Sequence, residues 1–281
     1  MVDLKETNRL LDVLMATVDS PEPVAEGAEL YCGLDVGTAF IVLVVVGAAG
    51  EPVACAYQFA DVVRDGMVVD YMGACDIARS LKEQLEGRLG CELFQAAVAI
   101  PPGTENLDGG VVRNVAESAG FDVVAVFDEP TAANMVMGIE NGAVVDIGGG
   151  TTGISVLCDG RVVQCVDEST GGTHFSLVLA GAKGVGFDEA ESYKRDSANH
   201  AEVLRIVRPT VDKVASIVER SCRGFEVPEV ILVGGTAELT GIEDRMEHQL
   251  GMPVVKPSRP MFVTPLGIAC GCRAKVQGEG R

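Results

Sequence analysis

A glycine-rich turn between two apolar strands is the feature that most constrains how this chain can fold. The strands are predicted at residues 144–147 and 154–157, around the turn Gly148-Gly149-Gly150-Thr151. Glycines in such a turn leave backbone N–H groups open to a bound phosphate. Asp146 ends the first strand and suits Mg²⁺, which prefers one or two carboxylates with phosphate oxygens and retained water. The pattern indicates a phosphate-binding hairpin, with an ordinary β-hairpin as the alternative.

The same pattern occurs a second time near the start of the chain. Asp35-Val36-Gly37-Thr38 follows one apolar strand and precedes another, at residues 40–47. An internal repeat about a hundred residues apart predicts two similar domains. Because two such hairpins can hold one polyphosphate from opposite sides, the repeat favours a phosphate-binding role over a chance occurrence of the pattern.

Length and charge limit the class of protein. A chain of 281 residues with 47% hydrophobic and 22% charged residues suits two compact domains. The formal net charge of −19 argues against a nucleic-acid partner, because the protein would repel its phosphates. The longest apolar run, residues 40–46, is too short to span a bilayer, so we expect no membrane partner.

The nine cysteines predict a reducing, cytoplasmic location. They occur without a Cys-x-x-Cys pair, and several lie in predicted apolar strands: Cys32, Cys55, Cys158 and Cys165. No signal peptide is recognisable, so we expect small buried side chains rather than disulfides. Three scattered histidines provide no metal-ligand spacing, and we expect no metal site built from cysteine and histidine.

The first 27 residues are expected to form an amphipathic helix and a linker. The apolar residues of a helix over residues 1–18 share one stripe: Leu4, Leu11, Leu14 and Val18. Prolines and a glycine in residues 20–27 are typical of an extended linker. Such a helix cannot bury its stripe alone, so it docks either on this chain or on a partner protein.

From residue 30 onward, predicted strands alternate with predicted helices. Strands are predicted at residues 30–36, 40–47, 53–59, 62–67, 94–100, 123–127, 144–147, 154–157, 161–166 and 230–233. Helices are predicted at residues 73–89, 107–119, 128–137, 187–194, 201–220, 241–250 and 263–273, with a small-residue helix after Thr170. The alternation argues for an α/β fold.

The motif order resembles that of the actin-like ATPase superfamily, which includes DnaK-type chaperones, actin-like filament proteins and sugar kinases. The two hairpins resemble its two phosphate motifs. Asp128-Glu129-Pro130-Thr131-Ala132-Ala133 resembles the connecting motif, and Val98-Ala99-Ile100-Pro101 the strand before it. Val233-Gly234-Gly235-Thr236 resembles the adenosine motif. Each motif is weak alone, but the five occur in the family's order across residues 31–272.

This resemblance implies two similar actin-like, ribonuclease-H-like domains. Each would be a mixed β-sheet flanked by helices, with a nucleotide cleft between the two. The first domain would comprise residues 28–140, completed by a C-terminal helix at 262–275, and the second residues 141–261. The implied cofactors are ATP and Mg²⁺.

The matched positions imply roles in catalysis and phosphate binding. Asp35 and Asp146 would hold Mg²⁺ through water, and Glu129 would orient or polarise the attacking water, so these three are the candidate catalytic residues. A carboxylate that stabilises a helix start is the alternative role for Glu129. Phosphate contacts are implied for Gly37, Thr38, Gly148, Gly149, Gly150 and Thr151.

Four further positions are implied to bind the nucleoside. Gly234 and Gly235 would let adenosine lie against the backbone. Glu191 and Lys194 share one helix face and match a Glu-x-x-Lys element of the filament-forming and cell-division relatives. A surface ion pair is the alternative for these two residues.

Three departures from the DnaK-type chaperones limit the comparison. Glu238 stands where the chaperones carry an arginine that packs on the base. Their catalytic lysine has no counterpart, because residues 53–97 hold a single lysine, Lys82, on a predicted surface helix. No peptide-binding domain follows the ATPase region, so we expect no complete foldase cycle from this chain alone.

By size and signature the chain resembles the EutJ family, the chaperone-like proteins of ethanolamine utilisation, a system that works with a bacterial microcompartment. This implies a cytoplasmic ATP-binding chaperone-like protein, inside or at the microcompartment. Slow Mg²⁺-dependent hydrolysis would drive closure between the domains and change the surface offered to a partner. That partner would be a protein client or a microcompartment component, reached through the N-terminal helix.

Two other functions remain open. A non-hydrolysing nucleotide-binding scaffold or assembly module of the same superfamily is the main alternative, and the missing lysine favours it. A small-molecule kinase would need a polar acceptor pocket with a catalytic base, and the sequence shows no clear aspartate motif for one.

Overall fold

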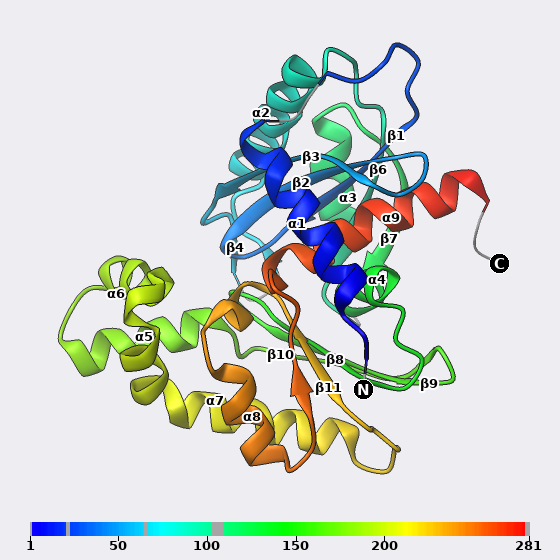
Figure 1. Cartoon of the computed structure of the whole chain (residues 1–281). Helices are drawn as coiled ribbons and strands as arrows, with labels where there is room; N and C mark the ends of the chain where they lie inside the picture. Colours follow the sequence, from blue (N-terminus) through cyan, green and yellow to red (C-terminus); the bar gives the residue numbers. More distant parts are fainter. Residues whose placement is uncertain (1, 21–22, 65–66, 103–108, 279–281) are drawn as a thin grey trace. The chain divides into compact units, whose positions relative to one another are not determined.

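The chain divides into two compact units in the computed structural model, which describes residues 2–20, 23–64, 67–102 and 109–278. The first unit comprises residues 3–138 and the C-terminal segment from residue 262, and the second comprises Val2 and residues 139–261 (Figure 1). Each unit has its own sheet and its own hydrophobic core.

A five-stranded mixed sheet with the order β3-β2-β1-β6-β7 forms the centre of the first unit. Three antiparallel strands are extended on one side by two parallel strands: β1 (Leu30–Val36), β2 (Phe40–Gly47), β3 (Pro52–Phe59), then β6 (Gln95–Ile100) and β7 (Asp122–Asp128). The carboxyl ends of β1, β6 and β7 therefore meet at one edge of the sheet, where ligands of α/β proteins commonly bind.

Helices cover both faces of this sheet. One face packs in a shared core with α2 (Tyr71–Leu89) and α3 (Gly109–Ser118), and α9 (Val263–Gln277) lies on the other face beside α4 (Glu129–Met137). Two short strands, β4 (Val63–Arg64) and β5 (Met67–Val68), form a separate ribbon. The C-terminal helix thus completes a unit whose other elements precede residue 139.

The contact between α9 and its neighbours depends on glycine. A Cβ at Gly33 of β1 would meet the Ala269 backbone, and a Cβ at Gly267 of α9 would overlap the carbonyl oxygen of Ala132 in α4. Glycine at these positions therefore allows a helix to approach a strand and a second helix at backbone distance.

The N-terminal helix α1 (Lys5–Asp19) docks on its own chain. It packs on β3, and Leu11 and Leu14 have no exposed surface. The Thr7 hydroxyl donates a hydrogen bond to the Val136 carbonyl at 3.4 Å. The sequence left open whether the apolar stripe of this helix docks on its own chain or on a partner protein. In the structure it docks on its own chain.

The second unit repeats the plan of the first. Its sheet has the order β10-β9-β8-β11-β12, again three antiparallel strands extended by two parallel ones: β8 (Gly142–Ile147), β9 (Thr152–Cys158), β10 (Arg161–Glu168), β11 (Val230–Val233) and β12 (Val254–Val255). Its helices are α5 (Gly172–Lys183), α6 (Phe187–Arg195), α7 (His200–Cys222) and α8 (Ile242–Leu250), and its short 3₁₀ turns are η1 (Ser197–Asn199) and η2 (Gly235–Glu238). The identical strand order confirms the predicted pair of similar domains, each with a mixed sheet flanked by helices.

Predicted and observed elements differ in a few places. The helix predicted from residue 107 is observed from Gly109, since residues 107–108 lie outside the described part. Residues 21–22 of the predicted linker and 65–66 of the predicted strand at 62–67 also lie outside it. Cys165 was expected to be buried but is exposed, because β10 is an edge strand, and Cys158 is half-buried.

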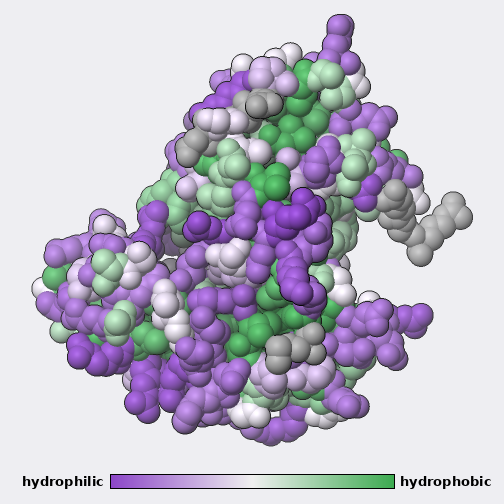
Figure 2. Space-filling model, in the orientation of Figure 1, coloured by the Kyte–Doolittle hydropathy of each residue, from purple (hydrophilic) through white to green (hydrophobic). Residues whose placement is uncertain are grey.

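The visible surface agrees with the high charge of the chain. Figure 2 shows hydrophilic side chains over most of the face in view, with smaller groups of hydrophobic side chains between them. None of the helices in the described ranges combines the length and apolar character needed to cross a bilayer.

We predict that Gly267→Ala destabilises the protein by at least about 2 kcal/mol, because the added methyl group must displace backbone at a packed helix contact. Gly87→Ala is the matched control, since Gly87 lies on α2 with nothing within 4 Å of an added Cβ. That control should gain about 0.5–1 kcal/mol from helix propensity. Urea unfolding of both variants measures the difference, and equal stabilities would contradict the packing argument.

Candidate functional site

The glycine-rich hairpin of the second unit joins β8 to β9. The Gly148 N–H donates to the Thr151 carbonyl at 3.0 Å and closes the turn. Asp146 stands near the end of β8, with only 6% of its surface exposed. Its neighbours in register are Gly153 on β9 and Val233 on β11. A buried carboxylate therefore lies beside the turn.

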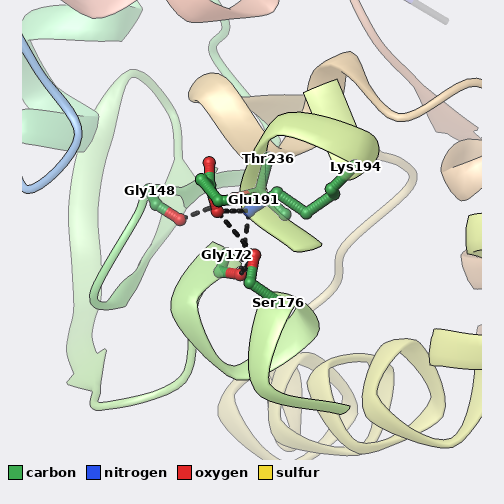
Figure 3. Close-up of polar contacts among 6 residues, drawn as sticks. All are labelled: Gly148, Gly172, Ser176, Glu191, Lys194 and Thr236. Carbon is green, nitrogen blue, oxygen red and sulfur yellow. Dashed lines mark hydrogen bonds and ion pairs between the residues drawn. The ribbon is translucent and has the colours of Figure 1, made fainter. Parts of the chain in front are cut away.

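Two neighbouring segments fix the orientation of this turn. At the start of α5, the N–H groups of Gly172 and Thr173 donate to the carbonyls of Gly148 and Gly149 at 3.0 and 2.7 Å. The Thr236 hydroxyl also donates to the Gly148 carbonyl, at 2.7 Å (Figure 3). With their carbonyls held by protein donors, the peptide units of the turn have a fixed direction, which a phosphate cradle requires.

Glu191 and Lys194 form a largely buried ion pair next to the turn rather than an exposed one. The Lys194 ammonium contacts the Glu191 carboxylate at 2.7 Å, and the two side chains are 12% and 13% exposed. Lys194 also donates to the Gly172 carbonyl at 2.9 Å, and the Ser176 hydroxyl donates to Glu191 (Figure 3). Burial lowers the pKa of Lys194, and the charge of Glu191 opposes that shift.

The two glycines after β11 differ in what surrounds them. Gly234 has φ +89°, and a Cβ there would overlap the Asp146 carboxylate and the Ile147 carbonyl oxygen. Gly235 is exposed, and a Cβ there would meet only the Met261 side chain at 4.0 Å. Glu238 is partly buried, and burial raises the pKa of its carboxyl while the Met261 N–H opposes the shift.

We predict that Gly234→Ala and Gly235→Ala separate the two roles of this glycine pair. The first change should lower stability and displace Asp146, because it adds a methyl group at positive φ against the carboxylate. The second should unfold at the same temperature as the wild type, within about 2 °C. Thermal melts of both variants test this, and a tolerated Gly234→Ala would contradict the observed contact.

Asp167 on β10 is a site residue that sequence reasoning missed. Burial raises the pKa of its carboxyl to about 6, a hydrogen bond from Thr151 opposes the rise, and the carboxylates of Asp146 and Glu168 add to it. Its Oδ1 atom is buried without a hydrogen-bond partner among the described residues. The only available sequence signal was an aspartate at the end of the strand that follows the hairpin.

The raised pKa of Asp167 predicts a pH-dependent loss of stability in the metal-free chain. The folded pKa of about 6 lies above the unfolded value of 3.8, so folding disfavours the ionised carboxyl, and stability falls as the pH rises from about 4 to about 6. Asp167→Asn should remove this loss. Its stability advantage over the wild type should be absent below pH 4, grow to pH 6 and stay constant above. Urea titrations in EDTA between pH 4 and 8 measure it, and a pH-independent difference would contradict the assignment.

The first unit carries the other predicted site residues. Asp35 is half-buried on β1, and the Gly37 N–H donates to the Phe40 carbonyl at 3.0 Å in the turn that contains Thr38. The strand register places Leu34 beside Val98 and Ile100 beside Asp128. Asp35 and the end of β7 therefore lie at the same edge of the sheet, with β6 between them.

Glu129 is the first residue of α4. Asp128 caps this helix, accepting a hydrogen bond from the Thr131 N–H at 2.9 Å, and Pro130 occupies the first turn, where its missing N–H has no cost. Glu129 is half-buried in this turn. The cap role belongs to Asp128, which leaves Glu129 as a first-turn carboxylate at the carboxyl edge of the sheet.

Lys82 is buried, which corrects the prediction of a surface lysine. Its ammonium donates to the Gly120 carbonyl at 3.0 Å, lies 3.6 Å from Glu86 and sits 4.8 Å from the centre of the Phe121 ring. One side of α2 packs against α3, and Lys82 is among the buried residues of α2. Lys82 therefore joins α2 to the turn after α3 and is not a free catalytic cation.

No group of three or more histidine, cysteine, aspartate or glutamate side chains with metal-site geometry occurs among the described residues. The carboxylates near the hairpin suit a hydrated cation, which prefers few direct protein ligands.

Two protein families match parts of the sequence. The MreB/Mbl protein family matches residues 56–179, and the type IV pilus assembly protein PilM family matches residues 123–266. The sequence is 41% identical to the ethanolamine utilization protein EutJ of Salmonella typhimurium (strain LT2) over 264 residues, 94% of this chain and 93% of that protein.

Solved structures give the same grouping. The structure matches the crystal structure of the ethanolamine utilization protein EutJ from Carboxydothermus hydrogenoformans with a TM-score of 0.89 and 46% identity, over 95% of this chain and 99% of that chain. MreB5 of Spiroplasma citri bound to ADP matches with a TM-score of 0.70 over 89% of this chain and 98% of that chain. At 15% identity, the MreB5 match shows a shared fold and no more.

Proposed function

Because the chain belongs to the EutJ family of ethanolamine utilisation proteins and has the actin-like ATPase fold, we propose that it is a chaperone-like protein that binds ATP with Mg²⁺. The observation that carries this proposal is the hairpin of the second unit. Its Gly148 carbonyl is held by Gly172 and Thr236, and the buried Asp146 lies beside it. The MreB5 relative of the same fold binds ADP, which supports a nucleotide as the ligand.

The residues present fit a magnesium nucleotide. At Gly171 a Cβ would come within 2.8 Å of the Gly148 and Gly149 carbonyl oxygens, so only glycine lets the chain before α5 pack this closely against the turn. Bound Mg²⁺ neutralises charge on the transferred phosphate. Asp146 and Asp35 would hold that ion through water, and the two hairpins would bind the β- and γ-phosphates through their N–H groups and the hydroxyls of Thr38 and Thr151.

Glu191, Lys194 and the two glycines after β11 would bind the nucleoside. Lys194 already donates to the Gly172 carbonyl, so it links the nucleoside side of the site to the first turn of α5. Glu129 would orient the attacking water for slow hydrolysis. A γ-phosphate bound by both hairpins would favour one arrangement of the two units and so change the surface offered to a partner.

The partner of this cycle would be a protein of the ethanolamine utilisation system or a component of its microcompartment. The PilM family, which the second unit and its flanks match, is named for pilus assembly and supports a role through protein contacts. The apolar stripe of α1 is covered in this structure, so a partner would use it only after the helix leaves β3.

Isothermal titration and steady-state turnover with Mg·ATP test the proposal. We expect wild-type binding with slow turnover, and Asp146→Asn should weaken Mg·ATP binding by about 10- to 100-fold, because it removes a carboxylate from the cation. Glu129→Gln should bind normally and lose about 100-fold or more in turnover, because it removes the group that acts on water. Glu140→Gln, an exposed carboxylate change, is the control. No heat with wild-type protein would refute nucleotide binding.

A nucleotide-binding scaffold without hydrolysis is the second candidate. The burial of Lys82 against Gly120 favours it, because residues 53–97 contain no other lysine to act in catalysis. In that case Glu129→Gln and the wild type would bind Mg·ATP equally and show the same negligible turnover. The two candidates therefore differ in one measured rate.

A further inference from the structure

Three strands of the second unit place two carboxylates in one row. Asp146 on β8 lies opposite Gly153 on β9, and Gly153 lies opposite Asp167 on β10. Residues directly opposite one another on neighbouring strands point to the same face of a sheet. Asp146 and Asp167 therefore share a face, with a glycine between them that has no side chain to separate them.

The spacing of this row suits one small hydrated ion. Two strand separations place the Asp146 and Asp167 backbones about 10 Å apart, and the residue between them, Gly153, has no side chain. The charged groups that act on the Asp167 carboxyl are the carboxylates of Asp146 and Glu168. Like charges in a buried place repel one another, and a cation removes that repulsion.

The second observation concerns the Asp167 side chain itself. One oxygen accepts a hydrogen bond from Thr151, a residue of the phosphate turn, while Oδ1 is buried and has no hydrogen-bond partner in the described part of the chain. Buried carboxylate oxygens are normally hydrogen-bonded or bound to an ion, because desolvation of an unpartnered one is costly. This oxygen therefore has an unused binding position beside the turn.

We propose that Asp167 is a second carboxylate of the cation site at the phosphate hairpin, acting with Asp146 across Gly153. The proposal rests on the proposed binding of a magnesium nucleotide at this turn. Under this proposal the second unit contributes two carboxylates to the ion, those of Asp146 and Asp167. The cation that suits such a site is hydrated Mg²⁺, since Mg²⁺ binds through few carboxylates and keeps several of its water ligands.

Binding of Mn²⁺, a paramagnetic substitute for Mg²⁺, tests the assignment on the full chain. Electron paramagnetic resonance of free Mn²⁺ gives its affinity with and without ADP. Asp167→Asn should weaken Mn²⁺ binding about tenfold or more in both states, as loss of a group around a metal site does. ADP affinity in EDTA should be unchanged or higher, because the change removes a negative charge and leaves the backbone cradle intact.

Glu168→Gln is the matched control. Glu168 is the next residue on β10, pairs with Arg220 at 2.8 Å and points to the opposite face, so its loss should change Mn²⁺ affinity far less than the loss of Asp167. Asp167→Ser gives a second removal of the carboxylate if the asparagine variant does not fold. Equal Mn²⁺ affinities of wild type, Asp167→Asn and Glu168→Gln would overturn the proposal.

The test also separates this proposal from the function on which it rests. If the wild type does not bind ADP or ATP, the proposed function fails, and Mn²⁺ binding by the nucleotide-free chain still decides the role of Asp167. A loss in Asp167→Asn but not in Glu168→Gln would support the cation site on its own. Absence of Mn²⁺ binding by the wild type in both states would overturn it.

Discussion

The carbonyl group of Gly148 is the point on which the candidate site depends. It accepts hydrogen bonds from the Gly172 N–H and the Thr236 hydroxyl, so it joins the hairpin to the start of α5 and to the turn after β11. Three segments separated in sequence meet there. Because a peptide unit held by its oxygen cannot rotate freely, the turn has a fixed conformation, which the proposed phosphate binding would require.

Close backbone packing is the second constraint, and glycine satisfies it in both units. In the first unit Gly33 and Gly267 allow α9 to contact β1 and α4. In the second, Gly171 and Gly234 leave room for the turn carbonyls and for Asp146. The largely buried Glu191–Lys194 pair adds a polar contact whose two charges compensate each other, although such pairs give more positional specificity than stability. The close packing of the backbone around the candidate site therefore depends mainly on glycines, which have no side chain.

Sequence reasoning predicted the repeated architecture but not the surroundings of individual side chains. Lys82 was assigned to a surface because its helix is amphipathic and lysine is usually exposed, whereas α3 and the Gly120 turn cover that position. Cys165 was assigned to a core because its strand is apolar, whereas β10 is an edge strand with one neighbour. Asp167 was overlooked because only the register of β8, β9 and β10 places it in line with Asp146.

The sequence by itself determined the α/β class, the repeated hairpin motif and the two glycine-rich turns, because hydrophobic periodicity and turn residues are local properties of the chain. Only the tertiary structure decided that α1 covers β3 and that Glu191 and Lys194 lie together in a largely buried contact. Those outcomes depend on contacts between segments far apart in the chain. A local pattern predicts that an apolar stripe will be buried, but which surface buries it depends on the packing of the whole chain.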